Sequence, residues 1–232
     1  MTPSTPNIIT LTHGKSKLAL HLLREGWGRP LLILHGLGEH APQTVPPHVD
    51  QWAGPIYALD LTGHGASTRT VGGGYTAEIL MADVDAAVSH LGKATVYGRG
   101  LGAYLALLIG GGRPNDVRGV ILADGPGLVG GGIRPSSPHI AGPPPVADAD
   151  ASEGPGGASM ADPYALDELS RDVRPPDYAV EFVRQMMQWS ELDRPIAVAT
   201  VVRPEWLAAV VAEPGVLETS VVEALTLYAE VR

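Results

Sequence analysis

The amino-acid sequence predicts an α/β fold, a mostly parallel, doubly wound sheet with helices on both faces. Two apolar runs that end in glycine, residues 30–36 and 54–65, are typical of strands buried on both faces. Between residues 76 and 125, segments of helical periodicity alternate with such strands. This order favours parallel strands joined by crossover helices. The length of 232 residues and a hydrophobic content of 44% suit one such domain.

The elements before residue 125 follow from polarity and capping signals. Residues 18–26 alternate in polarity and stop at a glycine-rich turn, which predicts an early antiparallel strand. Residues 76–92 carry a broad apolar stripe at helical spacing, with Thr76 as the N-cap and Gly92 as the C-terminal stop. The other elements predicted in this half are the strands 93–98 and 117–125 and the helix 101–111.

The second half begins with a change in composition. Residues 125–161 are dominated by Gly, Pro, Ala and Ser, which bury too little apolar surface to offset the entropy of ordering. We therefore predict a lid region at 125–192 within a single domain, flexible at 125–161 and helical at 162–192. Residues 1–124 and 193–232 would form the core. The elements predicted there are a strand at 194–202, a helix at 204–213 and a terminal helix or strand–helix element at 217–231.

Composition limits the functional classes. The net charge of −9 argues against nucleic acid or an anionic membrane as the main partner. The absence of cysteine excludes disulfides, thiolate metal sites and a cysteine nucleophile, and we expect no metal and no cofactor. The first residues lack a signal-peptide pattern and no apolar run approaches the roughly 20 residues of a membrane helix, so we expect a cytoplasmic protein.

The stretch VYGRGLGAY, residues 96–104, fits two motifs. Gly98, Gly100 and Ala103 match the G-x-G-x-x-A turn of dinucleotide-binding folds, with Asp124 ending the next strand. The same stretch matches the G-x-S-x-G turn of hydrolases, with Gly100 in place of the serine. The dinucleotide turn normally lies in the first βα unit, whereas at least two strands precede this one. Dinucleotide binding at 98–103 is therefore kept only as a remote alternative.

Two further motifs favour the hydrolase interpretation. The strand at 30–36 ends in His35-Gly36, and the next strand is followed by Asp60-x-x-Gly63-His64-Gly65-x-Ser67. Together with the glycine turn, this order and spacing resembles the α/β-hydrolase superfamily, firmly over residues 18–125. The glycine turn also resembles that of the non-catalytic Ndr-type group. The resemblance implies an α/β-hydrolase-like fold in which the G-x-S-x-G turn is the nucleophile elbow.

Carried over residue by residue, the family's catalytic set is incomplete. The nucleophile position is Gly100, and no histidine follows His139 to serve as the base. In this family the catalytic acid follows either of two strands, and Asp124 occupies one of these two positions. The oxyanion hole consists of backbone amides, here those of Leu37 and Leu101, and the resemblance implies that it persists. Glycine at the elbow also relieves a backbone strain that costs about 1–3 kcal/mol in other residues. The triad is degenerate, as in a pseudoenzyme.

Two hypotheses follow. The first is non-catalytic binding of a small apolar or carbonyl- or carboxylate-bearing ligand, or of a protein partner, with a homodimer left open. Its candidate binding residues are His35, Gly36, Leu37, Arg99, Leu101, Met186 and Trp189. The second is an ester hydrolase or lyase in which Asp124 acts with His40 or His139 as the base. For His35, His64, Asp60 and Ser67, the resemblance favours structural roles.

Overall fold

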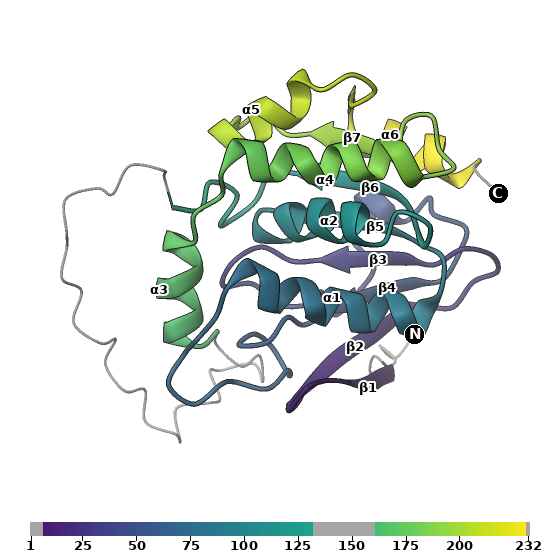
Figure 1. The fold of residues 1–232 in the computed structure, drawn as a ribbon. Coiled ribbons are helices and arrows are strands. Elements are labelled where there is room, and N and C mark those ends of the chain that lie inside the picture. Colours follow the sequence, from purple (N-terminus) through teal and green to yellow (C-terminus); the bar gives the residue numbers. More distant parts are fainter. Residues whose placement is uncertain (1–6, 132–160, 231–232) are drawn as a thin grey trace.

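The computed structural model describes residues 7–131 and 161–230, which form three layers with a sheet in the middle (Figure 1). The described residues contribute eight strands in the order β1-β2-β4-β3-β5-β6-β7-β8. β2 pairs antiparallel with β1 and with β4, and every other neighbouring pair is parallel, which confirms the predicted sheet. The strands are β1 Asn7–His13, β2 Ser16–Arg24, β3 Leu31–Leu34, β4 Ile56–Leu59, β5 Ala94–Arg99, β6 Val117–Ala123, β7 Ile196–Ala199 and β8 Leu217–Glu218.

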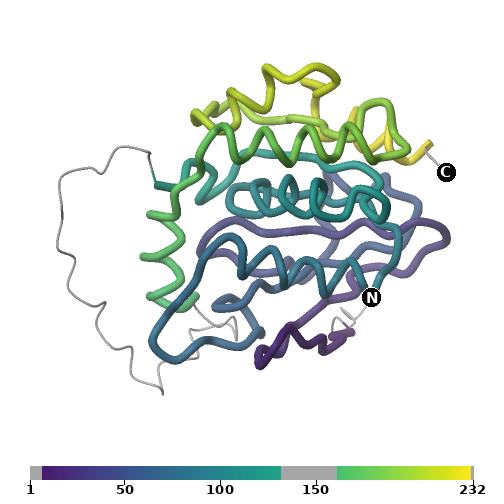
Figure 2. Tube along the Cα trace, viewed as in Figure 1, coloured from purple at the N-terminus to yellow at the C-terminus, as the bar shows by residue number. Residues whose placement is uncertain are grey.

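Helices cover both faces of the sheet. α1 (Ala77–Leu91), α2 (Leu101–Gly112) and α4 (Pro176–Trp189) lie in front of it in Figure 1, while α6 (Val221–Ala229) and the short helix η1 (Pro47–Val49) pack on the other face. Figure 2 shows α4 in green beside α2 in teal, although they are far apart in the sequence. α5 (Glu205–Ala212) packs against α4, and α3 (Pro163–Arg171) stands beyond the carboxyl ends of the strands.

The core explains why the central strands are apolar at every position. In β3, Leu32 and Leu34 are buried under the layer of α1 and α2, whereas Leu31 and Ile33 are buried on the side of α6. Successive side chains of a strand point to opposite faces of the sheet. In a strand covered on both faces every side chain is therefore buried, and apolar residues are favoured at every position.

Most predicted elements are present with small shifts at their ends. α1 begins where expected, because the Thr76 hydroxyl accepts a hydrogen bond from the amide of Ile79, and it stops at Gly92, whose φ is +75°. The terminal element is β8 followed by α6. The edge strand β1 was not predicted. None of the helices described is both long enough and apolar enough to cross a membrane.

The expected lid region is only partly described. Residues 132–160 lie outside the described residues, and with them His139. α3 and α4 account for most of the helical part, 162–192. Of these, α4 differs from a lid helix: it lies in the same layer as α2 and buries Val183 and Met186 in the main core.

Glycines allow α4 to approach α2 closely. A Cβ on Gly111 would lie 2.6 Å from the carbonyl oxygen of Phe182, whereas a Cβ on the neighbouring Gly112 would meet only the terminal methyl of Met81. We expect Gly111→Ala to destabilise the protein by about 1–3 kcal/mol through overpacking, despite the better helix propensity of alanine. Denaturant unfolding would measure this, with Gly112→Ala as the control. Equal stability of the two variants would contradict the prediction.

Candidate functional site

The turn between β5 and α2 has the geometry of a tight strand-to-helix elbow. Gly100, at its tip, has φ +59° and ψ −122°, a conformation that residues with a Cβ adopt only under strain. A Cβ on Gly98 would collide with the carbonyl oxygen of Gly102, and one on Gly102 would lie 2.6 Å from that of Leu34. The small residues of this motif are therefore required by close backbone packing.

The segment after β6, residues 125–128, covers this elbow, and we refer to it as the covering loop. The carbonyl oxygen of Pro126 accepts hydrogen bonds from the amides of Leu37 and Leu101, both at 2.9 Å. A Cβ on Gly100 would collide with the same oxygen and lie 2.7 Å from the carbonyl carbon of Gly125. This corrects one expectation: the two amides that we assigned to a ligand are occupied by the chain itself. Gly36 was also predicted to bind a ligand, and its amide donates to the Glu39 carboxylate.

Side chains from two other segments of the chain anchor the covering loop by hydrogen bonds to its carbonyl oxygens. Nη1 of Arg174 donates to the carbonyl oxygens of Gly127 and Leu128 at 2.6 and 2.7 Å. The indole of Trp206 donates to the Leu128 oxygen at 2.9 Å. Arg174 is buried, and its guanidinium lies 4.7 Å from the ring centre of Tyr104. The covering loop is thus an integral part of the packed structure.

The remaining amides at the start of α2 are also engaged. Gly102 donates to the carbonyl oxygen of His35, and Ala103 donates to that of Gly100. A dinucleotide phosphate would need such amides free at the helix N-terminus. The geometry therefore offers no support for the dinucleotide alternative.

Two buried histidines join the loops that follow β3 and β4. His35 donates from Nδ1 to its neighbour's carbonyl oxygen and accepts at Nε2 from the amide of Leu61. His64 accepts at Nε2 from the amide of Gly38, and the two rings lie 5.0 Å apart. Burial, with the nearby His64, lowers the pKa of His35 from 6.5 to about 3, and burial also lowers the pKa of His64. Both rings are neutral linkers whose hydrogen bonds fix these loops.

Asp60 and Ser67 have similar structural roles. Burial alone would raise the pKa of Asp60, but hydrogen bonds from His21 and from the amides of Ala41 and Ala66 lower it below its usual value. The Ser67 hydroxyl donates to the carbonyl oxygen of Asp60 and accepts from the Ala19 amide. These hydrogen bonds hold the loop of the second motif, residues 60–67, against strand β2 of the sheet.

Asp124, the candidate acid, anchors a loop. One carboxylate oxygen accepts from the amide of Val201 at 2.6 Å and the other from the amide of Val202 at 3.1 Å. In the described part of the chain its side chain bonds to no histidine. Asp124 and His40 are therefore not joined by a hydrogen bond, and the second candidate base, His139, lies outside the described residues.

The anchoring role of Asp124 is testable. We expect Asp124→Asn to destabilise the protein by about 1–3 kcal/mol, because an amide replaces one of two charge-assisted acceptors and turns an N–H toward another N–H. Denaturant unfolding would measure the change. The control is Asp177→Asn, at the exposed start of α4. An unaltered stability of Asp124→Asn would contradict the anchoring role.

A pocket of about 470 Å³ lies beside the covered elbow, between the loop after β3 and the ends of β3 and β5. It brings together three of the predicted site residues, His35, His40 and Arg99. Sequence reasoning missed Glu39, His48 and Tyr97, which also line it. Glu39 lies three residues after Gly36 of the His35-Gly36 motif, and this proximity was the signal that could have identified it. The other lining residues are Ile33, Gly38, Pro42 and Pro46.

Two predicted binding residues lie elsewhere. Met186 is fully buried in the main core, where its sulfur would lie 2.7 Å from a Cβ on Gly110. Trp189, at the end of α4, is 59% exposed. Neither lines the pocket beside the elbow. In the part of the chain that is described, no three His, Asp or Glu side chains are placed to hold a metal ion.

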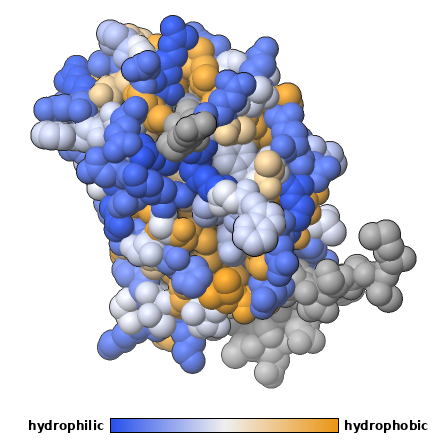
Figure 3. Space-filling model, turned by 90° about the vertical axis from the view of Figure 1, so that its right-hand side faces the viewer, coloured by the Kyte–Doolittle hydropathy of each residue, from blue (hydrophilic) through white to orange (hydrophobic). Residues whose placement is uncertain are grey.

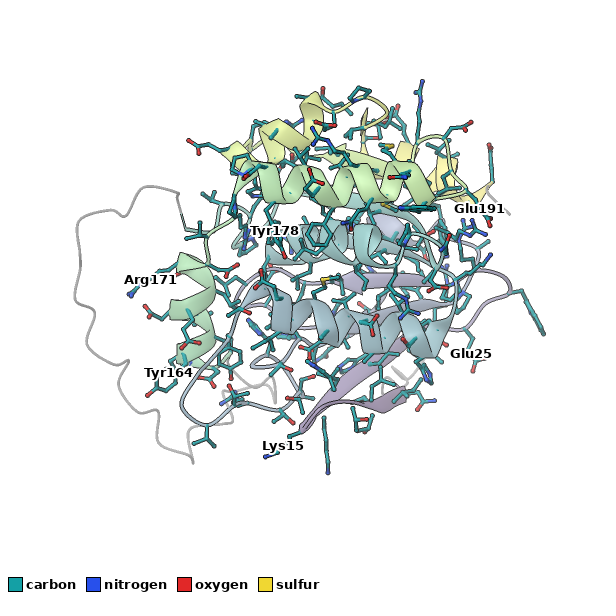
Figure 4. The ribbon with its side chains drawn as sticks, in the orientation of Figure 1. Lys15, Glu25, Tyr164, Arg171, Tyr178 and Glu191 are labelled. Atoms are coloured by element: carbon teal, nitrogen blue, oxygen red, sulfur yellow. The ribbon has the colours of Figure 1, made fainter. Side chains whose placement is uncertain are left out.

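A second cavity of about 630 Å³ lies at the opposite end of the sheet, between residues 191–194 and α6. Glu191 marks this end in Figure 4, and Figure 3 views the molecule from that side, where hydrophilic and hydrophobic residues are mixed. Two of its acidic side chains are engaged structurally: Glu191 pairs with Arg118, and Glu223 caps α6 with Ser220. None of the predicted site residues lies there.

Comparison with known proteins agrees with the geometry of the elbow. A family model described as "Alpha/beta hydrolase family" matches residues 31–226. The thioesterase domain from the curacin biosynthetic pathway superposes with a TM-score of 0.64 at 16% identity, covering 97% of this chain and 98% of that chain. An N-formylmaleamic acid deformylase from Pseudomonas putida S16 gives a TM-score of 0.63 at 15% identity, covering 93% and 91%.

At such identities the structural similarity shows the fold alone, and no curated protein sequence matches the chain. The family match spans most of the chain and includes all three motifs. It confirms the resemblance seen in the sequence. The protein belongs to the alpha/beta hydrolase family.

Proposed function

We propose that this member of the family binds a ligand or a partner without catalysing hydrolysis. The observation that carries the proposal is the Pro126 carbonyl oxygen, which accepts from both amides that the resemblance assigns to the oxyanion hole. A substrate carbonyl would have to displace it before those amides could stabilise a developing negative charge. The covering loop is held by Arg174 and Trp206, so this displacement has a cost.

The residues at the elbow support the same proposal. The serine mechanism needs a nucleophile, a base that takes its proton, and donors for the oxyanion. Gly100 offers no side chain, and the sequence has no histidine after residue 139. Both carboxylate oxygens of Asp124 bind backbone amides instead of orienting a base.

The ligand side of the proposal rests on the pocket beside the elbow. Apolar side chains of Ile33, Pro42 and Pro46 line it together with polar groups of Tyr97 and Arg99. Pockets that bind small molecules combine apolar walls with a few polar groups in this way. A small ligand with a carbonyl or carboxylate group suits such a lining, and a protein partner is the other occupant to test.

Two assays test the absence of hydrolysis. We expect no labelling by a serine-reactive fluorophosphonate and no turnover of short- and medium-chain chromogenic esters above the level of an unfolded control. A serine hydrolase assayed in parallel shows that the reagents work. Weak turnover that survives every substitution would come from the backbone donors, which become available only when the covering loop opens. Turnover lost in both Asp124→Asn and His40→Gln would support the hydrolase or lyase alternative instead.

A further inference from the structure

The pocket beside the elbow contains polar groups whose hydrogen-bonding capacity is not used within the described chain. Nη1 of Arg99 donates to both oxygens of Glu39, at 2.8 and 3.0 Å, while its Nε and Nη2 have no partner among the described residues. The Tyr97 hydroxyl likewise bonds to none of them, although the residue is only 4% exposed. A guanidinium edge with two N–H groups that bond to none of the described residues matches the two oxygens of a carboxylate.

We infer that this pocket binds a small monocarboxylate with an apolar body, its carboxylate on the Nε–Nη2 edge of the Arg99 guanidinium. The inference rests on the proposed non-catalytic function and names the ligand of that site. The apolar body would lie against Ile33, Pro42 and Pro46, and the Tyr97 hydroxyl would donate a further hydrogen bond.

The charges around Arg99 favour an anion over a cation. Glu39 is the carboxylate of the pocket, and its oxygens are already engaged by Arg99 and by the Gly36 amide, which leaves little for a cationic ligand. His48 faces Tyr97 edge-on at 5.4 Å, and burial together with Arg99 lowers its pKa, so its ring is neutral at pH 7. His40, the third histidine of the pocket lining, donates from Nδ1 to the carbonyl oxygen of Ala41.

Three aromatic probes of similar size test the inference: benzoate, its neutral analogue benzamide and the cation benzylammonium. We expect benzoate to bind with a Kd on the order of 1 mM, as suits a fragment held by one ion pair, and the other two to bind at least about tenfold more weakly. NMR titration gives the location, because the amides of Gly38 and Glu39 and the Nε–H of Arg99 should shift together.

Two pocket substitutions should act in opposite directions. Arg99→Gln should weaken benzoate binding at least about tenfold, because the charge-assisted hydrogen bonds are lost. Glu39→Gln keeps an acceptor for the Gly36 amide but removes the negative charge beside the ligand, and should strengthen binding about threefold or more. Arg184→Gln, which removes an exposed arginine on α4, should change nothing. Folding of each variant is read from the same spectra.

The outcomes separate the ligand from the proposed function. Benzamide binding as well as benzoate, no shift at the pocket, or weaker binding by Glu39→Gln would each overturn the carboxylate inference. None of these results would alter the ester and fluorophosphonate assays, which test catalysis alone. Conversely, labelling by the fluorophosphonate would overturn the non-catalytic function whatever benzoate does.

Discussion

Gly100→Ser is expected to destabilise the protein by about 2–6 kcal/mol and to leave it without hydrolase activity. The new Cβ would collide with the Pro126 oxygen, and the backbone at φ +59° adds its own strain. Relief requires the covering loop to move, which would break the hydrogen bonds from Leu37 and Leu101. The serine would still have no histidine to take its proton, so restoring the nucleophile alone does not restore a mechanism.

Chemical denaturation and fluorophosphonate labelling of the variant measure the two effects. The matched control is Gly14→Ser, because Gly14 has φ +56° but open space around its Cβ position. We expect Gly14→Ser to lose less stability, and this loss measures the cost of the backbone strain without the collision. A Gly100→Ser variant as stable as Gly14→Ser, or one that is labelled readily, would show that the covering loop does not block the elbow.

Acid should destabilise the fold through its buried histidines. In the folded protein the pKa of His35 is about 3, and that of His64 is also below 6.5, whereas both return to about 6.5 on unfolding. Below pH 6.5 these two histidines therefore bind protons in the unfolded chain but stay neutral in the folded chain, which favours unfolding. For His35 the stabilising effect of the neutral ring is complete above pH 6.5 and is lost as pH falls toward 3, by about 1.4 kcal/mol per pH unit, and His64 adds to the loss in the same direction.

Unfolding free energies measured between pH 7 and pH 4.5 would test this. His35→Gln should be less stable at pH 7, since it loses the ring that joins Gly36 and Leu61, but its stability should fall less steeply with acid. His90→Gln, at an exposed position on α1, should keep the parent slope. The groups that face His35 are His64, Asp60 and His40. Equal slopes for His35→Gln and the parent would refute the assignment.

The sequence predicted the sheet well because its central strands leave a strong signal. Strands buried on both faces are uniformly apolar, and the helices between them carry caps such as Thr76. β1 was missed for the opposite reason: it lies at the edge, pairs only with β2, and none of its residues is fully buried. Ile9 and Leu11 do alternate with Thr10 and Thr12, but these apolar positions are only half-buried and the alternating run is short, so the pattern was not read as a strand.

The candidate site was predictable only in part. Local motifs located the elbow and the loops after β3 and β4, because glycine and histidine spacing is set within each turn. The covering loop depends on a tertiary path that brings Pro126 to Leu37 and Leu101, and no local pattern encodes that contact. Apolar spacing likewise marked Met186 on α4, but it could not reveal that its neighbour is Gly110 in the core.

The hydrogen bonds to Pro126 also give the elbow a measurable opening equilibrium. In a pocket open to water, the amide hydrogens of Leu37 and Leu101 would exchange with solvent quickly. Bonded to a carbonyl of their own chain, they exchange only when the covering loop detaches. Their exchange rates under native conditions therefore report the free energy of that detachment separately from global unfolding. This is the free energy that any ligand competing for the two amides would have to overcome.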